Sequence, residues 1–393
     1  MTTNNTFFDI NYMRGTDSQF NRLVKCSDEC IEQLTSAQKL NFIDFIFQRS
    51  KQDKASLICN YKCVRELNYY NCKFKGRWIF MYILGFTEIF SSLCALSKLV
   101  INITYIKEIK KKLLYNTNNN ILKNSNILNN TNNNILYNKN IYLYNSNIRN
   151  TIAIEYIIHF IAMSLAFFSS FLFHLHETII TRNMDYFTAI FSIAMNACVT
   201  THRNIIILYY NIILKNNNIL YNTNNINNNI NNTNILYNTN NNIYNNNLFC
   251  IYILYFCIKY HIALFAFTSF FAYHVYRMAY VDFNYVYNMT ACAVLILIIQ
   301  ANYFLTVYNY RDNRLKRRVV ILTNLSIVSA LFELSDFPPV FYLLDSHFLW
   351  HVGLLLSIKP FYKFTFYEAK LFRRKYLGKY IGNKERVKVI NKK

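Results

Sequence analysis

The chain has 393 residues and a formal net charge of +22, yet charged residues make up only 16% of it and apolar residues 53%. A soluble globular protein carries about 25% charged residues, so this composition excludes a soluble domain. The apolar residues stand in runs close to the roughly 20 residues that a helix needs to cross a bilayer. The sequence therefore predicts an all-α membrane protein.

Seven apolar runs follow one another between residues 78 and 368. We expect each run to form a membrane-spanning helix, with the ranges 78–103, 152–173, 184–201, 248–273, 285–307, 319–334 and 348–366. The fifth run contains no charged residue. The predicted architecture is a seven-transmembrane helix bundle.

Two Asn-rich inserts interrupt this plan at 118–150 and 211–247, and both repeat the phrase Asn-Ile-Leu-Tyr-Asn. Tracts of this composition bury too little apolar surface to offset the entropy lost on ordering. We expect both inserts to be disordered loops that carry no chemistry.

Basic residues gather beside alternate runs. They lie at 107–112 after the first run, at 311–318 between the fifth and sixth, and in the tail 369–393. Short loops rich in Lys and Arg stay on the cytoplasmic side of a membrane. We therefore expect a luminal N-terminus and a basic cytoplasmic tail, and this placement of charge does not indicate nucleic-acid binding.

Five cysteines crowd the predicted luminal segment 1–77, and they are Cys26, Cys30, Cys59, Cys63 and Cys72. In an oxidising lumen such cysteines form disulfides, whose pairing the spacing leaves open. The alternative is a zinc site built from the two Cys-x3-Cys pairs. The first residues contain no apolar signal-peptide core, which conflicts with a luminal N-terminus.

Polar residues near the luminal ends of the expected helices can carry chemistry. Ser170 and His174 are four residues apart, as are His347 and His351, so each pair shares a helix face. Asp185 follows after a short turn. Three imidazoles with a carboxylate and a hydroxyl match a catalytic zinc site, where three protein ligands leave one position for water. The structural alternatives are incidental histidines, a serine bonded to its own backbone, and an aspartate at a helix N-terminus.

These residues lie in segments that resemble a known family. The stretch Phe173-His-Leu-His-Glu-Thr-Ile-Ile-Thr-Arg-Asn-Met-Asp-Tyr-Phe187 resembles the signature of the Per-like family, the post-GPI-attachment-to-proteins factor 3 proteins, in the CREST superfamily of membrane hydrolases. Residues 333–351 resemble its second signature. Further similar segments are Cys59-Asn-Tyr-Lys-Cys63, Gly76-Arg-Trp, Gly85-Phe-Thr-Glu88 and 274–288. The resemblance covers residues 26 to about 368, apart from the inserts.

The resemblance implies a phospholipase A2-type hydrolase that removes the sn-2 acyl chain from the lipid of GPI-anchored proteins, in endoplasmic reticulum and Golgi membranes. It implies a zinc ion held by His174, His347 and His351. Asp185 would act as general base, and Ser170 would hydrogen-bond the water or the developing oxyanion. Glu88 would not bind the metal itself but would support the residues that do.

The chain also departs from the family pattern. Within the first signature, His176-Glu177 stands where the family tends to have Arg-Asp, and we expect His176 to point away from His174 and bind no metal. Asn284 and Val286 replace an Asp and a Gly of the family, which leaves substrate contacts there open. The histidines that match no motif are expected to be packing or interface residues, and they are His159, His202 and His261.

Other functions remain as alternatives. A CREST-type ceramidase or receptor would share the histidines but not the Asp336-Phe-Pro-Pro segment or the luminal cysteines. A non-catalytic GPI-processing factor would keep the motifs. A transporter would show internal repeats and broken helices, whereas only Gly85 and Gly353 lie within or near the runs.

The predicted orientation has a direct test. Asn129 and Asn231 begin Asn-x-Thr acceptor sites inside the two inserts. Because both inserts are predicted to be cytoplasmic, neither should receive a glycan when single-site variants are expressed in glycosylation-competent microsomes. A glycan on either insert would contradict the orientation.

Overall fold

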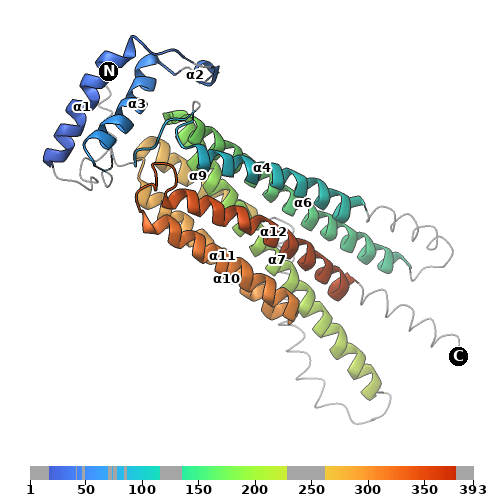
Figure 1. The fold of residues 1–393 in the computed structure, drawn as a ribbon. Helices are drawn as coiled ribbons and strands as arrows, with labels where there is room; N and C mark the ends of the chain where they lie inside the picture. Colours follow the sequence, from blue (N-terminus) through green and yellow to red (C-terminus); the bar gives the residue numbers. More distant parts are fainter. Residues whose placement is uncertain are drawn as a thin grey trace. The chain divides into compact units, whose positions relative to one another are not determined.

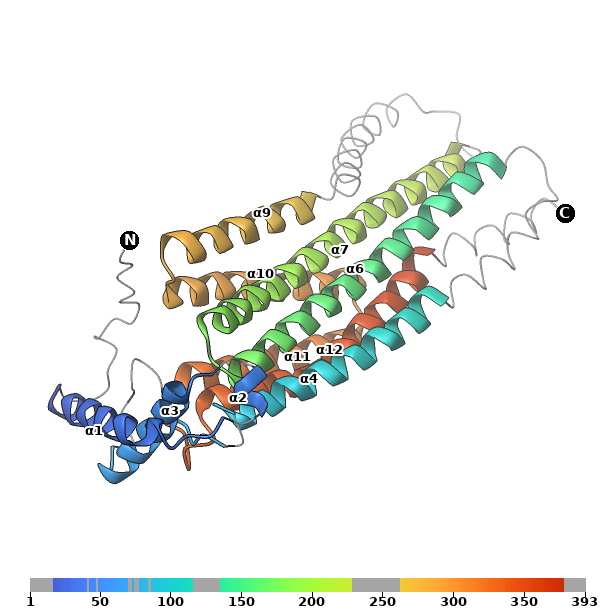
Figure 2. The ribbon, with the colours of Figure 1, turned by 90° about the horizontal axis from the view of Figure 1, so that it is seen from above.

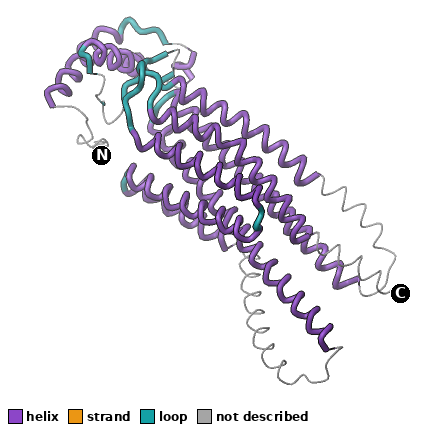
Figure 3. The backbone as a smooth tube through the Cα atoms, turned by 60° about the horizontal axis from the view of Figure 1, so that its bottom comes forward, coloured by secondary structure: helices purple, strands orange, loops and turns teal. Residues whose placement is uncertain are grey.

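The computed structural model describes residues 17–40, 42–46, 49–69, 73, 78–83, 86–115, 135–227 and 262–377. Figure 3 shows these residues as helices joined by loops, without a strand, and two isolated bridge pairs are the only β-type pairing among them. A helix satisfies its own backbone hydrogen bonds, as a segment inside a bilayer must. The predicted all-α fold is confirmed for the described residues.

Figure 1 labels the helices in chain order. They are α1 (Asp17–Thr35), α2 (Phe42–Ile46), α3 (Lys51–Glu66), α4 (Ile89–Ile109), α6 (Ile135–Leu175), α7 (Ile179–Asn227), α9 (Ile262–Tyr276), α10 (Tyr285–Tyr310), α11 (Asn313–Ser335) and α12 (Ser346–Phe372). Short π-helical turns continue three of them, and these are η2 (Lys110–Tyr115), η3 (Arg277–Val281) and η4 (Arg373–Leu377).

Four of the described helices are long and apolar enough to cross a membrane. They are Ile89–Lys112, Ile154–Leu175, Tyr285–Tyr310 and Asn313–Ser335, which correspond to the first, second, fifth and sixth expected spans. The third and seventh expected spans lie within α7 and α12, and the described part of the fourth lies in α9. The count of seven spans stays a prediction.

The first span begins later than the predicted residue 78. Helix α4 starts at Ile89, because the described backbone before it forms a tight turn between Ile83 and Phe86 and otherwise pairs with other segments. The N–H of Met81 donates to the carbonyl of Tyr342 at 3.0 Å, and the N–H of Glu88 donates to the carbonyl of His174 at 3.1 Å. The apolar run therefore includes a loop that fastens α4 to its neighbours.

Parts of both inserts are helical in the structure, and their disorder stays a prediction. Helix α6 already begins at Ile135 and α7 continues to Asn227, so residues 135–150 and 211–227 are helical. Residues 116–134 and 228–247 of this region lie outside the described residues.

The chain divides into two compact units. The first unit contains Met1–Thr104, Met163–Ala189 and Ile321–Phe361, and it includes every candidate site residue. The second unit contains Tyr105–Ala162, Ile190–Val320 and Tyr362–Lys393. Its buried cluster consists of Tyr156, Val199, Ile206, Ile207, Tyr210 and Phe372.

Buried ion pairs also stabilise the second unit. Arg203 pairs with Glu368, and the Glu368 carboxylate accepts a hydrogen bond from the Tyr156 hydroxyl at 2.7 Å. His202 lies 2.5 Å from Glu155, as a packing residue would. Buried charges of this kind are tolerated only when they are paired.

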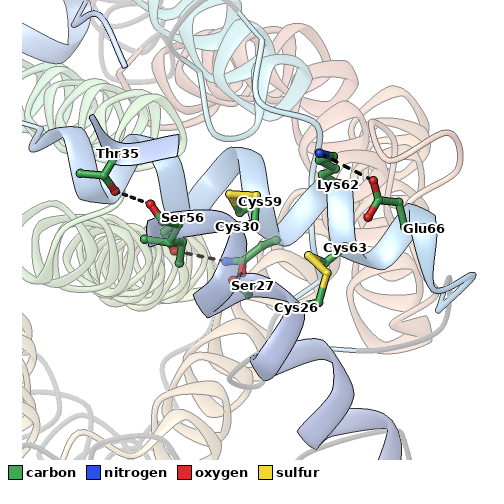
Figure 4. Close-up of a disulfide and its surroundings, with 11 residues drawn as sticks. Cys26, Ser27, Cys30, Thr35, Ser56, Cys59, Lys62, Cys63 and Glu66 are labelled. Atoms are coloured by element: carbon green, nitrogen blue, oxygen red, sulfur yellow. Dashed lines mark hydrogen bonds and ion pairs between the residues drawn. A yellow bond between two sulfur atoms is a disulfide. The ribbon is translucent and has the colours of Figure 1, made fainter. Parts of the chain in front are cut away.

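Two disulfides brace the N-terminal helices of the first unit. Cys26 is bonded to Cys63 and Cys30 to Cys59, which joins α1 to α3 (Figure 4). Each pair with x3 spacing occupies one helix face, and the crossed order of the bonds requires antiparallel helices. The prediction of disulfides is confirmed, and the zinc alternative is wrong because all four sulfurs are bonded. Cys72 lies outside the described residues.

The pairing predicts a specific peptide map. Cleavage at Lys62 separates Cys59 from Cys63, and cleavage at Asp28 or Glu29 separates Cys26 from Cys30. A non-reduced digest with trypsin and an acid-specific protease should yield the 26–63 and 30–59 linked peptides only. Replacing Cys30 and Cys59 together with Ser should remove one linked peptide and lower the free energy of unfolding by about 2–3 kcal/mol, because the remaining 26–63 bond still closes the long loop and only the short ring between the two bonds is opened. A 26–59 linkage would contradict the helix arrangement.

Candidate metal centre

Three histidines converge in the first unit. His174 lies in the last turn of α6, and His347 and His351 lie in the first two turns of α12. The Nε2 atom of His351 is 3.0 Å from Nε2 of His174 and 3.1 Å from Nε2 of His347. One ligand atom from each ring lies within 4.8 Å of the others, which is close enough to hold one metal ion.

The ends of two helices determine where these rings lie. Helix α12 begins after Asp345, whose carboxylate accepts a hydrogen bond from the N–H of Phe348 at 2.7 Å and so caps the helix. Burial raises the pKa of the Asp345 carboxyl, and the Glu88 carboxylate raises it further. At the end of α6, the carbonyl of His174 accepts a hydrogen bond from the backbone N–H of Glu88. The backbone that carries the ligands is thus fixed on both sides.

The outer nitrogens of two rings face carboxylates. Nδ1 of His174 is 2.8 Å from Glu88, and Nδ1 of His347 is 2.8 Å from Glu333. A carboxylate at this position holds the ring proton on Nδ1 and leaves Nε2 as a lone pair. Both rings therefore point a metal-binding nitrogen at the common centre.

The outer nitrogen of the third ring faces an amine. Lys98, which is 1% exposed in α4, contacts Nδ1 of His351 through its Nζ atom. The tautomer of His351 decides which of the two atoms donates. The same Nζ lies 5.1 Å from the ring centre of Phe167, so this cation site is enclosed by aromatic and imidazole rings. Figure 2 shows α4 running alongside α12, which brings Lys98 to His351.

Helices α11 and α12 approach closely next to the ligands. A Cβ atom on Gly353 would stand 2.1 Å from the Ser329 hydroxyl, so only glycine fits at this crossing. Ser329 is one turn from Glu333, and Gly353 is two residues from His351. Small residues that let two helices approach are a common device in membrane proteins. Here they bring Glu333 within reach of His347.

Ser170 and Asp185 lie beside the three histidines. Ser170 is buried one turn before His174, and its hydroxyl donates a hydrogen bond to the Asp185 carboxylate near the start of α7. Asp185 also interacts electrostatically with His174, His347 and Lys98. A carboxylate with a hydrogen-bond donor thus adjoins the centre without belonging to the three-histidine cluster.

The donor set fits zinc. Three neutral imidazoles are among the commonest protein ligands of a catalytic zinc ion, and ligands 2.0–2.1 Å from the metal in a tetrahedral site stand roughly 3.3 Å apart. The two measured separations of 3.0 and 3.1 Å are close to that value. The outer carboxylates are the partners that metal-bound histidines ordinarily have.

The structure brings together the histidines that the sequence singled out. Glu88 also lies where a supporting role requires, against His174. His176 is buried nearby but is not part of the three-histidine cluster. His159 and His202 are buried in the second unit, and His261 lies outside the described residues.

Sequence reasoning missed Glu333 and Lys98. Lys98 interrupts an otherwise apolar span, and an ionisable residue inside a membrane helix is itself a signal of function. Glu333 stands at the start of the second signature, two residues before α11 ends, but its partner His347 is on another helix. Neither contact has a spacing rule that could have predicted it.

Comparisons with known proteins agree on a family. A model of the Per1-like family matches residues 46–369. The chain is 34% identical over 93 residues to the GPI-specific phospholipase A2-like PGAP3 of Bos taurus, a match that covers 23% of this chain and 28% of the relative. It is 36% identical over 107 residues to the protein of the same name from Danio rerio, covering 25% and 30%. It is 29% identical over 99 residues to post-GPI attachment to proteins factor 3 of Drosophila melanogaster, covering 24% and 30%.

These matched segments span less than a third of the length of the curated relatives. No solved structure matches the chain.

The ligand assignment can be tested by metal analysis. Purified full-length protein should hold about one zinc ion per chain. His347→Ala and His351→Ala should each lose it, while Glu333→Gln, which keeps a hydrogen-bond acceptor without the charge, should lower metal affinity roughly 10–100-fold. His176→Ala is the matched control, because it removes a buried neighbouring imidazole outside the cluster, and it should keep the metal. Zinc retained in a His347→Ala/His351→Ala double variant would refute the assignment.

Proposed function

The chain belongs to the Per1-like family, and on that premise we propose that it hydrolyses the sn-2 acyl ester in the lipid of GPI-anchored proteins. The observation that carries this proposal is the three-histidine cluster with Ser170 and Asp185 beside it. The names of the relatives, a GPI-specific phospholipase A2-like protein and a post-GPI attachment factor, point to the same chemistry. The substrates would be GPI-anchored proteins in the endoplasmic reticulum or Golgi membrane.

Zinc held by His174, His347 and His351 would supply a Lewis acid that polarises an ester carbonyl and lowers the pKa of a bound water toward roughly 7. The protein supplies the rest. Asp185 lies beside the cluster, where its carboxylate can accept a proton from the attacking water and later return it to the leaving alcohol. Among the described carboxylates near the centre, Glu88 and Glu333 lie against ligand imidazoles, whereas Asp185 interacts with the Ser170 hydroxyl.

Ser170 is the hydrogen-bond partner of the proposed base, Asp185. Its hydroxyl donates to Asp185, so the geometry supports a role in orienting the carboxylate. The same hydroxyl would have to turn away from Asp185 to donate to an oxyanion, as the family resemblance suggests. Either role makes Ser170 an aid to turnover that is not needed for metal binding.

The helix ends also suit a lipid substrate. His174 and His351 are buried, whereas His347 is partly exposed, so within the described part of the chain a substrate can reach the cluster at His347. Apolar side chains are exposed at the start of α7, where Ile179 and Ile180 precede Asp185. An acyl chain could lie against such a surface while its ester reaches the base.

Substitutions at Asp185 and Ser170 separate catalysis from metal binding. Asp185→Asn keeps the size and a hydrogen-bonding group but cannot take up a proton near neutral pH. Release of fatty acid from GPI lipid by the purified protein should fall roughly 10²–10⁴-fold, as expected for loss of a general base. Ser170→Ala should cost no more than roughly 10²–10³-fold, the loss seen for one hydrogen-bond donor.

Both variants should keep their zinc, and His176→Ala should keep both zinc and activity. In cells that lack the gene, GPI anchors should retain the original sn-2 chain, and wild-type protein but not Asp185→Asn should restore remodelling. Restoration by Asp185→Asn would instead favour a non-catalytic GPI-processing factor. Full activity in metal-free protein would exclude the zinc-dependent reaction.

A further inference from the structure

Two phenylalanines on α2 are exposed although they belong to a well-fixed part of the first unit. Phe42 is 77% exposed and Phe45 is 76% exposed, and Leu40 just before the helix is 43% exposed. Neither ring contributes to the metal centre or to the apolar cluster around the disulfides. Exposed aromatic side chains gathered on one short helix indicate an interaction surface.

The exposure of these rings is built into the fold. Asp44, between them, is 0% exposed and accepts hydrogen bonds from Arg49 at 3.0 Å, Lys54 at 2.7 Å and the Tyr82 hydroxyl at 2.7 Å. On a helix, residues 42 and 45 share a face, and residue 44 lies on the opposite side from residue 42. Because the buried carboxylate holds its own side of α2 inward, the two rings are turned outward.

The same contacts join α2 to the chain just before the first membrane-spanning helix. Tyr82 lies shortly before Ile89, where the first membrane-spanning helix begins. The loop between them is itself anchored, since Phe86 and Ile83 exchange backbone hydrogen bonds and Glu88 donates to His174. Through Tyr82, α2 is therefore fastened to the segment of chain that enters the bilayer.

We propose that α2 is a membrane-interface anchor whose rings Phe42 and Phe45 insert at the boundary between lipid headgroups and acyl chains. Aromatic side chains favour this level of a bilayer. Lys39 and Lys51 flank the helix and are exposed, where they can reach lipid phosphates. This anchor keeps the disulfide-braced α1 and α3 at the lipid surface. It depends on the membrane span and not on the proposed hydrolysis.

A protein partner fits this surface less well. A stable protein interface buries about 800 Å² on each side. Two phenylalanine rings offer at most about 150–250 Å² each. The exposed residues next to them on α3 are polar or charged, including Lys51 and Gln52. The surface is thus large enough for insertion into lipid but small for a second copy of this chain.

Tryptophan fluorescence in reconstituted full-length protein can test the anchor. Phe42→Trp and Phe45→Trp would each add one reporter to the two native tryptophans, Trp78 and Trp350, whose signal is subtracted with the parent protein. In vesicles of phosphatidylcholine brominated near the headgroup, the added emission should be blue-shifted and lose more intensity than in unbrominated vesicles. Iodide in the buffer should quench it little.

Glu66→Trp provides the matched control, because Glu66 is an exposed polar residue of α3 in the same disulfide-braced segment. Its emission should be quenched by iodide and not by brominated lipid. The linked-peptide map and the zinc content verify that each variant is folded. If one of the two Phe variants does not fold, the other is enough to test the anchor. Emission from position 42 or 45 that responds to iodide and not to bromine would overturn the proposal. Emission shielded from both quenchers would also overturn it, because the rings would then be covered by protein.

Discussion

The meeting of three imidazole nitrogens at one point is the constraint on which the rest of the first unit depends. The rings come from the end of α6 and the start of α12, which are far apart in the sequence. On a helix, a slip of one residue turns a side chain by about 100° and moves it about 1.5 Å along the axis. Such a slip in either helix would separate Nε2 atoms that lie 3.0 and 3.1 Å apart. Both helix ends must therefore be fixed in register as well as in position.

The loop between α11 and α12 meets this requirement with help from the N-terminal segment. Three of its residues have positive φ angles, at 42° for Asp336, 55° for Phe341 and 59° for Tyr342, and such backbone costs about 1–3 kcal/mol per residue unless its surroundings hold it. Asp336 accepts hydrogen bonds from Lys73 at 2.6 Å and from the Trp78 indole at 3.0 Å. Tyr342 packs edge-on against a ring of α3, Tyr61, at 5.1 Å. The disulfide-braced helices thus support the loop that delivers His347.

Much of this site could be predicted from local spacing, and the limits of that prediction are physical. The i, i+4 pairs Ser170/His174 and His347/His351 share helix faces because of helix geometry alone, so the sequence places the two members of each pair side by side. Contacts between helices have no such rule. Lys98 meets His351 across 253 positions, and the cysteine pairs could be joined only when α1 and α3 were seen to be antiparallel. The start of α4 was missed because apolar composition does not distinguish a span from a loop whose backbone is paired elsewhere.

The charges around the histidines give a reason for a metal that is independent of family. Four carboxylates surround the rings, from Glu88, Asp185, Glu333 and Asp345, against the single amine of Lys98. The set is net negative even when Asp345 is protonated, and an uncompensated charge in such a buried place costs several kcal/mol. Extra protons on the rings of His174 and His347 would have to sit on their Nε2 atoms, because Glu88 and Glu333 already face the Nδ1 atoms. Two protonated rings at that separation would repel each other. A divalent cation held between the three rings would supply the missing charge without that repulsion.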